Sequence, residues 1–348
     1  MMGFNEVYFR LPVIVSAIID GPSRQHDCEP MSKQFTAREY PGGIIAIDSG
    51  MLGREMAACY LLETPAELAL IEVGSNYSAE RILAVLKRRG WSPEQVSHLI
   101  VTHVHLDHAG GAGSLMQVLP NAILVVHPRG APHLLDPSRL EASTREVYGD
   151  HVFERTYGRL VPAPPQRLRV MADGESLSVG KRELLFVDTP GHARHHFCIW
   201  DQQTHGWFTG DTFGISYRDL DTANGPFVFP ATTPTQFDPE ALISSVERLL
   251  ARSPQFMYLT HFGRVGDSER LGGQLIAAVR KLVAIAERHA TAASRTAEIE
   301  REMLEWLMQA ARAHGVNLSE QRLLDLFTPD VSLNTQGIEY WLDHRVAE

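Results

Sequence analysis

The segment Thr102–His108, THVHLDH in one-letter code, places three imidazoles and one carboxylate within six consecutive positions. It begins where the apolar run HLIVT ends. Imidazoles this close together repel one another as cations and lose hydration as neutral groups, so they are costly at the end of a buried strand. A divalent cation turns that cost into binding energy. The segment therefore predicts a metal site at a strand end, against the alternative of a polar histidine-rich loop.

Three further side chains complete the predicted site, and each follows a strand-like apolar run. They lie in the segments TPGH, FTGD and LTHFG. The full predicted metal-binding set is His103, His105, Asp107, His108, His192, Asp211 and His261.

The spacing of these residues predicts two ions. His103 and His105 alternate with one intervening residue, so an extended backbone points both to the same side, where His192 would complete a first set. Asp107 and His108 fall on the following turn and would form a second set with His261. Asp211 is the expected bridge, because a carboxylate has two oxygens and can hold two cations.

The predicted chemistry follows from two adjacent cations. They lower the pKa of a bridging water toward neutrality and so provide a hydroxide nucleophile, while one ion polarises the substrate oxygen. No serine or cysteine nucleophile is then needed. We assign Asp107 a catalytic role, either orienting this nucleophile or accepting its proton.

The same motifs resemble those of the metallo-β-lactamase-fold hydrolase superfamily, with a ligand set similar to that of glyoxalase II. THVHLDHAGG, TPGHARHH, FTGD and LTHFG occur in the family's order, over about residues 43–263. The resemblance implies an α/β fold, the αββα sandwich of two mixed sheets flanked by helices. It implies two divalent metal ions, with Zn2+ favoured and iron or manganese as alternatives.

Departures from the family pattern narrow the activity. Class B β-lactamases typically replace the residue at the Asp211 position, so antibiotic hydrolysis is not expected. The family's usual Asp in the strand before the first helix is Glu72 here. The presence of both His108 and His261 favours two metals over the single iron of the persulfide dioxygenases. No basic glutathione-binding motif follows the last ligand, which argues against glutathione thioesters.

Composition restricts the partners and the compartment. A net charge of −10 over 348 residues argues against nucleic acid as the main partner and favours a small-molecule substrate. Three cysteines without a C-x-x-C motif indicate a reducing, cytoplasmic environment. The apolar stretch 11–19 is too short to span a bilayer, so no membrane association is expected.

Three regions are expected along the chain. Residues 1–35 are a leader, with a weak signal peptide or a natural start at Met31 as alternatives. Residues 36–265 form the catalytic domain, and residues 266–348 form a C-terminal helical extension. Apolar stripes in the extension indicate helix packing. The extension has three alternative roles: substrate contacts, a homodimer interface or a purely structural addition.

Local signals predict several elements. Ser78 as N-cap and Gly90 as C-cap predict a helix between them, and the capping box at Ser92 predicts a short helix. Asp173-Gly174 predicts a hairpin turn between LRVM and SLSVG. Asp238 is expected to cap a helix that runs to Leu250.

Other conspicuous side chains carry open alternatives. His196 and Tyr217 are candidate substrate contacts, against positioning by His196 and loop anchoring by Tyr217. The loop aromatics Phe213, Phe227 and Phe229 share the alternatives of Tyr217, a pocket wall or an anchor. Thr102 and Asp188 are candidates for orienting ligand imidazoles, against ordinary strand-end capping.

The leading hypothesis is a dinuclear hydrolase of a small ester, thioester or lactone. A phosphodiesterase with the same two-metal site is the first alternative. The second is a sensor or effector that retains the metal and signals through its C-terminal helices.

Overall fold

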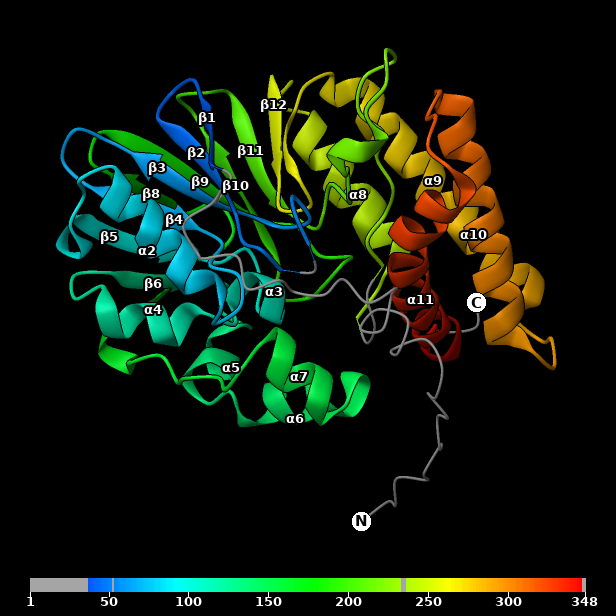
Figure 1. The fold of residues 1–348 in the computed structure, drawn as a ribbon, viewed down its shortest axis with the longest axis horizontal. Helices are drawn as coiled ribbons and strands as arrows, with labels where there is room; N and C mark the ends of the chain where they lie inside the picture. Colours follow the sequence, from blue (N-terminus) through cyan, green and yellow to red (C-terminus); the bar gives the residue numbers. More distant parts are fainter. Residues whose placement is uncertain (1–36, 52, 233–235, 346–348) are drawn as a thin grey trace.

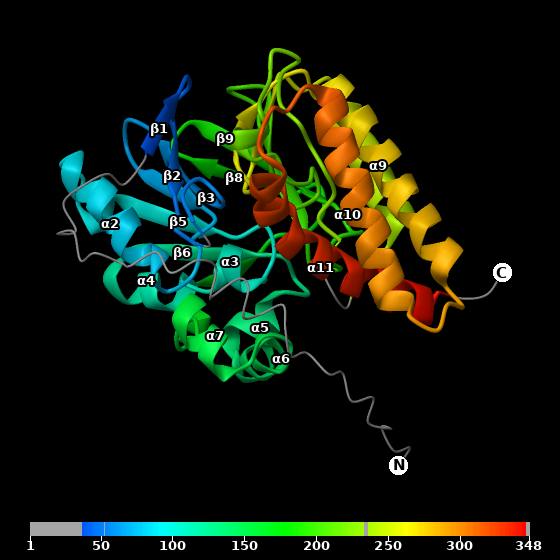
Figure 2. The same ribbon diagram turned by 45° about the vertical axis from the view of Figure 1, so that its right-hand side comes forward.

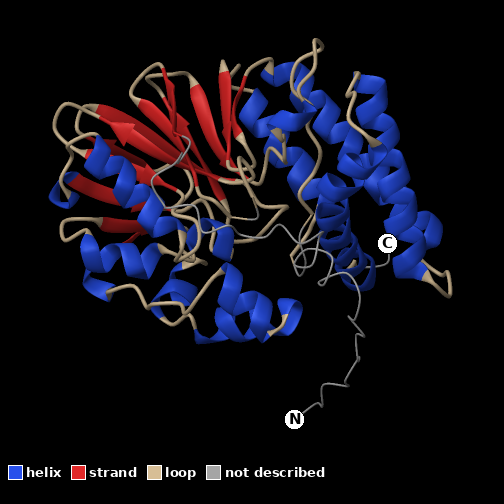
Figure 3. Ribbon diagram, viewed as in Figure 1, coloured by secondary structure: helices blue, strands red, loops and turns tan. Residues whose placement is uncertain are grey.

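Two β-sheets pack face to face with helices on both outer faces, and three long C-terminal helices lie beside them (Figure 1). The computed structural model describes residues 37–51, 53–232 and 236–345. This is the expected αββα sandwich with a C-terminal helical extension; Figure 3 shows the strands as its central layers. The predicted leader, residues 1–35, lies outside the described residues.

The first sheet has seven strands in sequence order. Its first four strands pair antiparallel, and the strands from β4 onward pair parallel. The strands are β1 (Ala37–Tyr40), β2 (Ile44–Asp48), β3 (Ala58–Glu63), β4 (Leu68–Ile71), β5 (Val96–Ile100), β6 (Ile123–Val126) and β7 (Leu168–Val170). The second sheet contains β8 (Ser176–Val179), β9 (Arg182–Asp188), β10 (Phe197–Asp201), β11 (Gly206–Gly210), β12 (Phe256–Leu259) and β13 (Gly263–Val265).

The outer helices cover both sheets. Figure 1 shows α2 (Ser78–Arg88) and α4 (Ala112–Val118) beside the first sheet, with α8 (Pro239–Leu250) beside the second. Four further helices lie at the lower edge of the sandwich: α3 (Leu106–Ala109), α5 (Ala131–Leu135), α6 (Ser138–Tyr148) and α7 (Asp150–Thr156). Single 3₁₀ turns occupy Pro93–Gln95, Pro165–Arg167 and Arg218–Leu220.

Alternate residues of a strand point to opposite faces of the sheet and so pack into two different cores. In β2, Ile45 and Ile47 face the core beneath α2 and α4, whereas Ile44 and Ala46 face the second sheet. Because both faces are buried, the strands are continuously apolar rather than alternating with polar residues. This burial holds the sheets together and leaves the strand ends free to carry polar side chains.

Most local signals predicted their elements, with two errors. The Ser92 capping box forms, but over a single 3₁₀ turn, and the Asp238 side chain accepts a hydrogen bond from the Ala241 amide, 3.0 Å away, at the start of α8. Ser78 is the first residue of α2 rather than its cap. The hairpin predicted at Asp173-Gly174 is wrong, because β7 pairs with β6 in the first sheet and β8 pairs with β9 in the second.

The C-terminal extension folds back onto the sandwich as α9 (Ser268–His289), α10 (Arg295–His314) and α11 (Glu320–His344), which Figure 2 shows as a layer of long helices. The stripe residues Ile299, Met303 and Leu307 are buried in a core that this layer shares with the loop after β11. A homodimer through these helices stays a prediction. Within the described part of the chain, no helix is long and apolar enough to cross a bilayer.

Candidate metal centre

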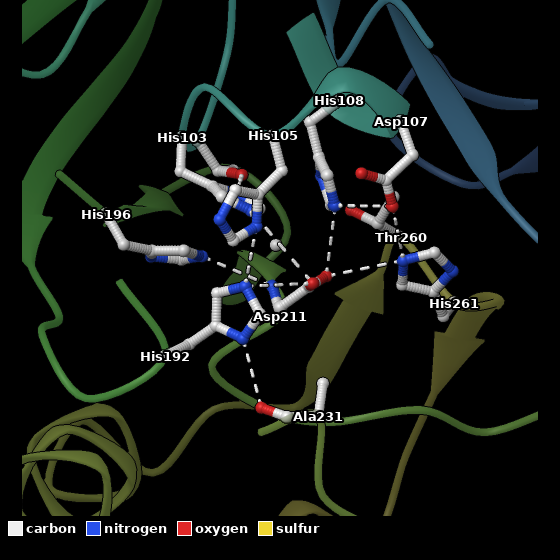
Figure 4. Close-up of polar contacts among 12 residues, drawn as sticks. His103, His105, Asp107, His108, His192, His196, Asp211, Ala231, Thr260 and His261 are labelled. Atoms are coloured by element: carbon white, nitrogen blue, oxygen red, sulfur yellow. Dashed lines mark hydrogen bonds and ion pairs between the residues drawn. The ribbon is translucent and has the colours of Figure 1, made fainter. Parts of the chain in front are cut away.

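The seven predicted ligands converge at one edge of the sandwich, although they are spread over more than 150 residues of sequence (Figure 4). The first four lie between the end of β5 and the first turn of α3. His192 follows β9, Asp211 follows β11 directly, and His261 lies just beyond β12. Both sheets therefore contribute side chains, and in each case the position follows a strand end.

Three imidazoles and one carboxylate oxygen form what we call the first cluster: His103, His105, His192 and Oδ2 of Asp211. His105 Nδ1 lies 2.8 Å from His103 Nε2 and 3.1 Å from His192 Nε2. Asp211 Oδ2 lies 3.2 Å from His192 Nε2 and 4.0 Å from His103 Nε2.

The second cluster contains Asp107, His108, His261 and Oδ1 of Asp211. Asp107 Oδ2 lies 3.2 Å from His108 Nε2 and 3.3 Å from His261 Nε2. Asp211 Oδ1 lies 3.2 Å from His108 Nε2 and 3.5 Å from His261 Nε2. The two oxygens of Asp211 thus face different clusters, as Figure 4 shows.

These atoms fit divalent cations. Ligand atoms around a tetrahedral zinc ion lie about 3.3 Å apart when each bond is about 2.0–2.1 Å, which agrees with most separations in both clusters. The buried atoms His108 Nε2 and Asp211 Oδ1 lie 3.2 Å apart, yet neither has a partner in hydrogen-bond geometry among the described residues. Buried polar atoms are costly without a partner, so this pair indicates a site for a cation.

Outer hydrogen bonds orient the imidazoles from the first motif. Glu72 accepts hydrogen bonds from the Thr102 hydroxyl and from Nδ1 of His108, the latter at 3.0 Å. Because the Thr102 hydroxyl donates to Glu72, it accepts from Nδ1 of His103, 3.1 Å away. Both rings therefore present an unprotonated Nε2 to the centre when neutral. This geometry favours the orienting role predicted for Thr102, and Glu72 supports the site from outside.

Two main-chain carbonyls orient the later histidines. His192 Nδ1 donates to the carbonyl of Ala231 over 3.0 Å, and His261 Nδ1 donates to the carbonyl of Met56 over 2.8 Å. Sequence analysis missed both acceptors, because a backbone carbonyl leaves no signature in residue type. Asp188, the other candidate for this role, lies 3.3 Å from His127 Nε2 and contacts no ligand imidazole in the structure described.

The backbone of Asp211 is fixed by His196. Nε2 of His196 accepts from the Asp211 amide over 3.2 Å, and Nδ1 lies 2.9 Å from the Thr189 hydroxyl. Gly210 makes this approach sterically feasible, because a Cβ there would lie 2.4 Å from His196 Nε2. Both ring nitrogens thus have protein partners, which favours the positioning alternative for His196 over a substrate contact.

Loop aromatics show a similar preference. The Tyr217 hydroxyl donates to Asp330 of α11 over 3.0 Å, and its ring is buried. Phe213, Phe227 and Phe229 are also buried, in the cores that join the loop to the helices. This geometry favours the anchoring alternative for all four side chains.

The imidazoles of the first cluster are uncharged. Burial lowers the pKa of His103, His105 and His192, and for His103 and His105 the neighbouring imidazoles lower it further. Neutral imidazole is the form that binds metal.

The second cluster behaves differently. Burial lowers the pKa of His261, but Asp211 and Asp107 outweigh it and raise the value to about 9. The pKa of His108 is likewise raised, because Asp107, Asp211 and Glu72 outweigh its burial. Burial raises the pKa of both Asp107 and Asp211, but the facing imidazoles overcome it and hold both carboxylates ionised.

Comparison with known proteins gives relatives of one family. The curated metallo-beta-lactamase fold-containing protein ST1585 of Sulfurisphaera tokodaii is 28% identical over 177 residues, 49% of this chain and 62% of that protein. An atrochrysone carboxyl ACP thioesterase of Aspergillus fumigatus is 27% identical over 175 residues, 49% and 44% of the two chains. An N-acyl homoserine lactonase of Bacillus thuringiensis is 25% identical over 228 residues, 59% and 79% of the two chains. The match thus spans less than two thirds of the archaeal protein and of the thioesterase.

Solved structures share the fold. TTHA1429 of Thermus thermophilus superposes with a TM-score of 0.58 at 20% identity, covering 82% of this chain and 88% of that chain. ST1585 from Sulfolobus tokodaii gives 0.54 at 24% identity, covering 69% and 86%. The family model described as the metallo-beta-lactamase superfamily matches residues 52–261. With more than half of its sequence accounted for in this way, the chain belongs to the metallo-beta-lactamase superfamily.

Proposed function

We propose that this protein is a dinuclear metal-dependent hydrolase of a small ester, thioester or lactone. The observation that carries the proposal is the orientation of Asp211, whose two oxygens face separate clusters. The thioesterase and lactonase among the relatives support a carbonyl substrate. The net charge of −10 supports a small molecule over a polyanion.

The residues have separate tasks in this proposal. Bound divalent ions, most suitably Zn2+, would supply a Lewis acid for the substrate oxygen and would activate a water molecule for attack. The five histidines, Asp107 and Asp211 would hold the ions. Asp107 has a side chain that is 22% exposed, against 4% for Asp211, so it is the carboxylate that solvent and substrate reach. We assign it the proton that the attacking water loses.

The test is a substrate panel on protein loaded with Zn2+. Nitrophenyl esters, an acyl thioester and homoserine lactones are compared with bis-nitrophenyl phosphate, before and after removal of metal with a chelator. We expect metal-dependent hydrolysis of at least one carbonyl substrate. His103→Ala should abolish it, and His151→Ala, at an exposed histidine in α7, should not.

Three outcomes would overturn the proposal. Turnover of the phosphodiester alone would establish the phosphodiesterase alternative. A metal content below one equivalent per chain would show that the protein has no catalytic metal centre. A cellular phenotype unchanged by His103→Ala combined with Asp211→Ala would favour the sensor or effector alternative.

A further inference from the structure

The segment Pro230–Thr232 connects the metal centre to the C-terminal helices. Its middle residue, Ala231, supplies the carbonyl that accepts from His192 Nδ1. The residue before this segment, Phe229, still pairs with Ile215 through two main-chain hydrogen bonds of 2.8 and 3.0 Å. Beyond Phe229 the main chain of the segment depends on other partners, since proline has no N–H to donate.

Asn334 of α11 supplies those partners. Its Oδ1 accepts from the Thr232 amide over 2.7 Å, and its Nδ2 donates to the Pro230 carbonyl over 2.9 Å. The Thr232 hydroxyl donates to the Asn334 carbonyl over 3.0 Å. One side-chain amide thus binds the residue before Ala231 and the residue after it, as a neighbouring strand would.

Burial makes this clamp rigid. Asn334 is 3% exposed, and Thr232 is fully buried. Val331 and Ile338, one turn to either side on α11, are buried in the helical core and fix the helix that carries the amide. An amide whose oxygen and nitrogen each have a main-chain partner in such surroundings is costly to disturb.

We propose that Asn334 is a positioning residue of the metal centre. By fixing the Ala231 carbonyl against His192 Nδ1, it sets the orientation and basicity of that imidazole, and with them the affinity of the first cluster for a divalent cation. Hydrogen-bond partners of metal-binding histidines typically change metal affinity by about 10–100-fold when removed. The C-terminal extension is on this account part of the centre.

The proposal rests on metal binding by the proposed hydrolase and is independent of its substrate. The test therefore measures Zn2+ affinity by competition with a chromophoric chelator at fixed pH, together with the visible spectrum of the Co2+-loaded protein. Asn334→Ala should weaken Zn2+ binding about tenfold and alter the Co2+ spectrum. Asn334→Asp keeps the acceptor for Thr232 but sets a second acceptor against the Pro230 carbonyl, so it should also weaken Zn2+ binding.

Thr335→Ala is the matched control. Thr335 is fully buried on the same helix, and its hydroxyl has no hydrogen-bond partner among the described residues. Truncation there perturbs the core of α11 without touching the clamp, so Zn2+ affinity should stay within about twofold of the wild type, well below the change expected for a lost partner of a metal-binding histidine. Chelator-treated samples unfolded in urea report how much each variant destabilises the fold itself.

The results separate the two proposals. Equal Zn2+ affinity in wild type, Asn334→Ala and Asn334→Asp would overturn this inference and leave the hydrolase proposal standing. Equal losses in Asn334→Ala and Thr335→Ala would also overturn it, because the effect would then be general destabilisation. A wild-type protein that binds no Zn2+ would overturn both.

Discussion

The two clusters share one carboxylate but differ in charge. The first sets three imidazoles against a single oxygen of Asp211, and burial keeps these imidazoles neutral. The second sets two imidazoles against Asp107 and the other oxygen of Asp211, and its imidazoles hold protons at neutral pH. The ratio of imidazoles to carboxylates therefore decides whether the imidazoles of a metal-free cluster bind protons or stay neutral until a metal cation binds.

Asp211→Ala should give the largest effect, because it removes one carboxylate oxygen from each of the two clusters. Lewis-acid stabilisation is worth several kcal/mol, and each 1.36 kcal/mol is tenfold in rate, so we expect activity to fall at least about a thousandfold. Steady-state kinetics on the best substrate of the panel, with Asp150→Ala at an exposed aspartate as control, measures this. Loss of less than tenfold would show that Asp211 does not serve both clusters.

Replacing one histidine in each cluster should separate them. His192→Ala and His261→Ala are each expected to retain about one of two metal equivalents and to lose activity about a hundredfold, since a two-metal clamp needs both ions. Elemental analysis of dialysed protein gives the stoichiometry. If either variant still bound two equivalents, the division into these clusters would be wrong.

The pH dependence of Zn2+ affinity should distinguish the two clusters without any substitution. With a pKa of about 9, His261 is protonated in metal-free protein at pH 7, so a metal ion must displace its proton. His108 is also held protonated, so two protons are displaced, and affinity at the second cluster should rise by up to about a hundredfold per pH unit between pH 6 and 8. The first cluster has imidazoles with lowered pKa values and should change little. Zn2+ titrations at several pH values would contradict this if both steps shifted equally.

Asp330 should give the smallest effect, and one on stability. Burial raises its pKa to about 7, so in folded protein it keeps a proton that the unfolded chain releases near pH 4. Between about pH 4 and 7 the unfolded chain gives up this proton and the folded chain keeps it, so the wild type loses stability as the pH rises over that range, whereas Asp330→Asn has nothing to ionise. The stability of the variant relative to wild type should therefore be about 2–3 kcal/mol greater at pH 8 than at pH 5. Urea unfolding at both values checks this, and a gain independent of pH would contradict it.

The side chains that could bind a metal were predictable from the sequence, whereas the backbone contacts that orient them were not. His192, Asp211 and His261 each follow an apolar run, and the structure brings them together because strand ends meet at one edge. The Met56 and Ala231 carbonyls escaped prediction because any residue supplies a carbonyl. Asn334 escaped because nothing in a helical stripe marks one amide as a clamp.

The hairpin error has a related cause. Asp173-Gly174 does form a turn, with φ +81° at the glycine, but the strands on either side enter different sheets. Turn chemistry specifies a local change of direction and contains no information about which sheet receives the next strand. Only the packing of the two sheets decides that.

Each cluster draws on both sheets. In the first, residues from the β5–α3 segment meet His192 and Asp211 of the second sheet; in the second, the same segment meets His261 and Asp211. A bound cation would thus be a non-covalent cross-link between the two sheets, reversible by chelation. At a free concentration 100 times its Kd, each bound cation would add about 2.7 kcal/mol to the free energy of unfolding.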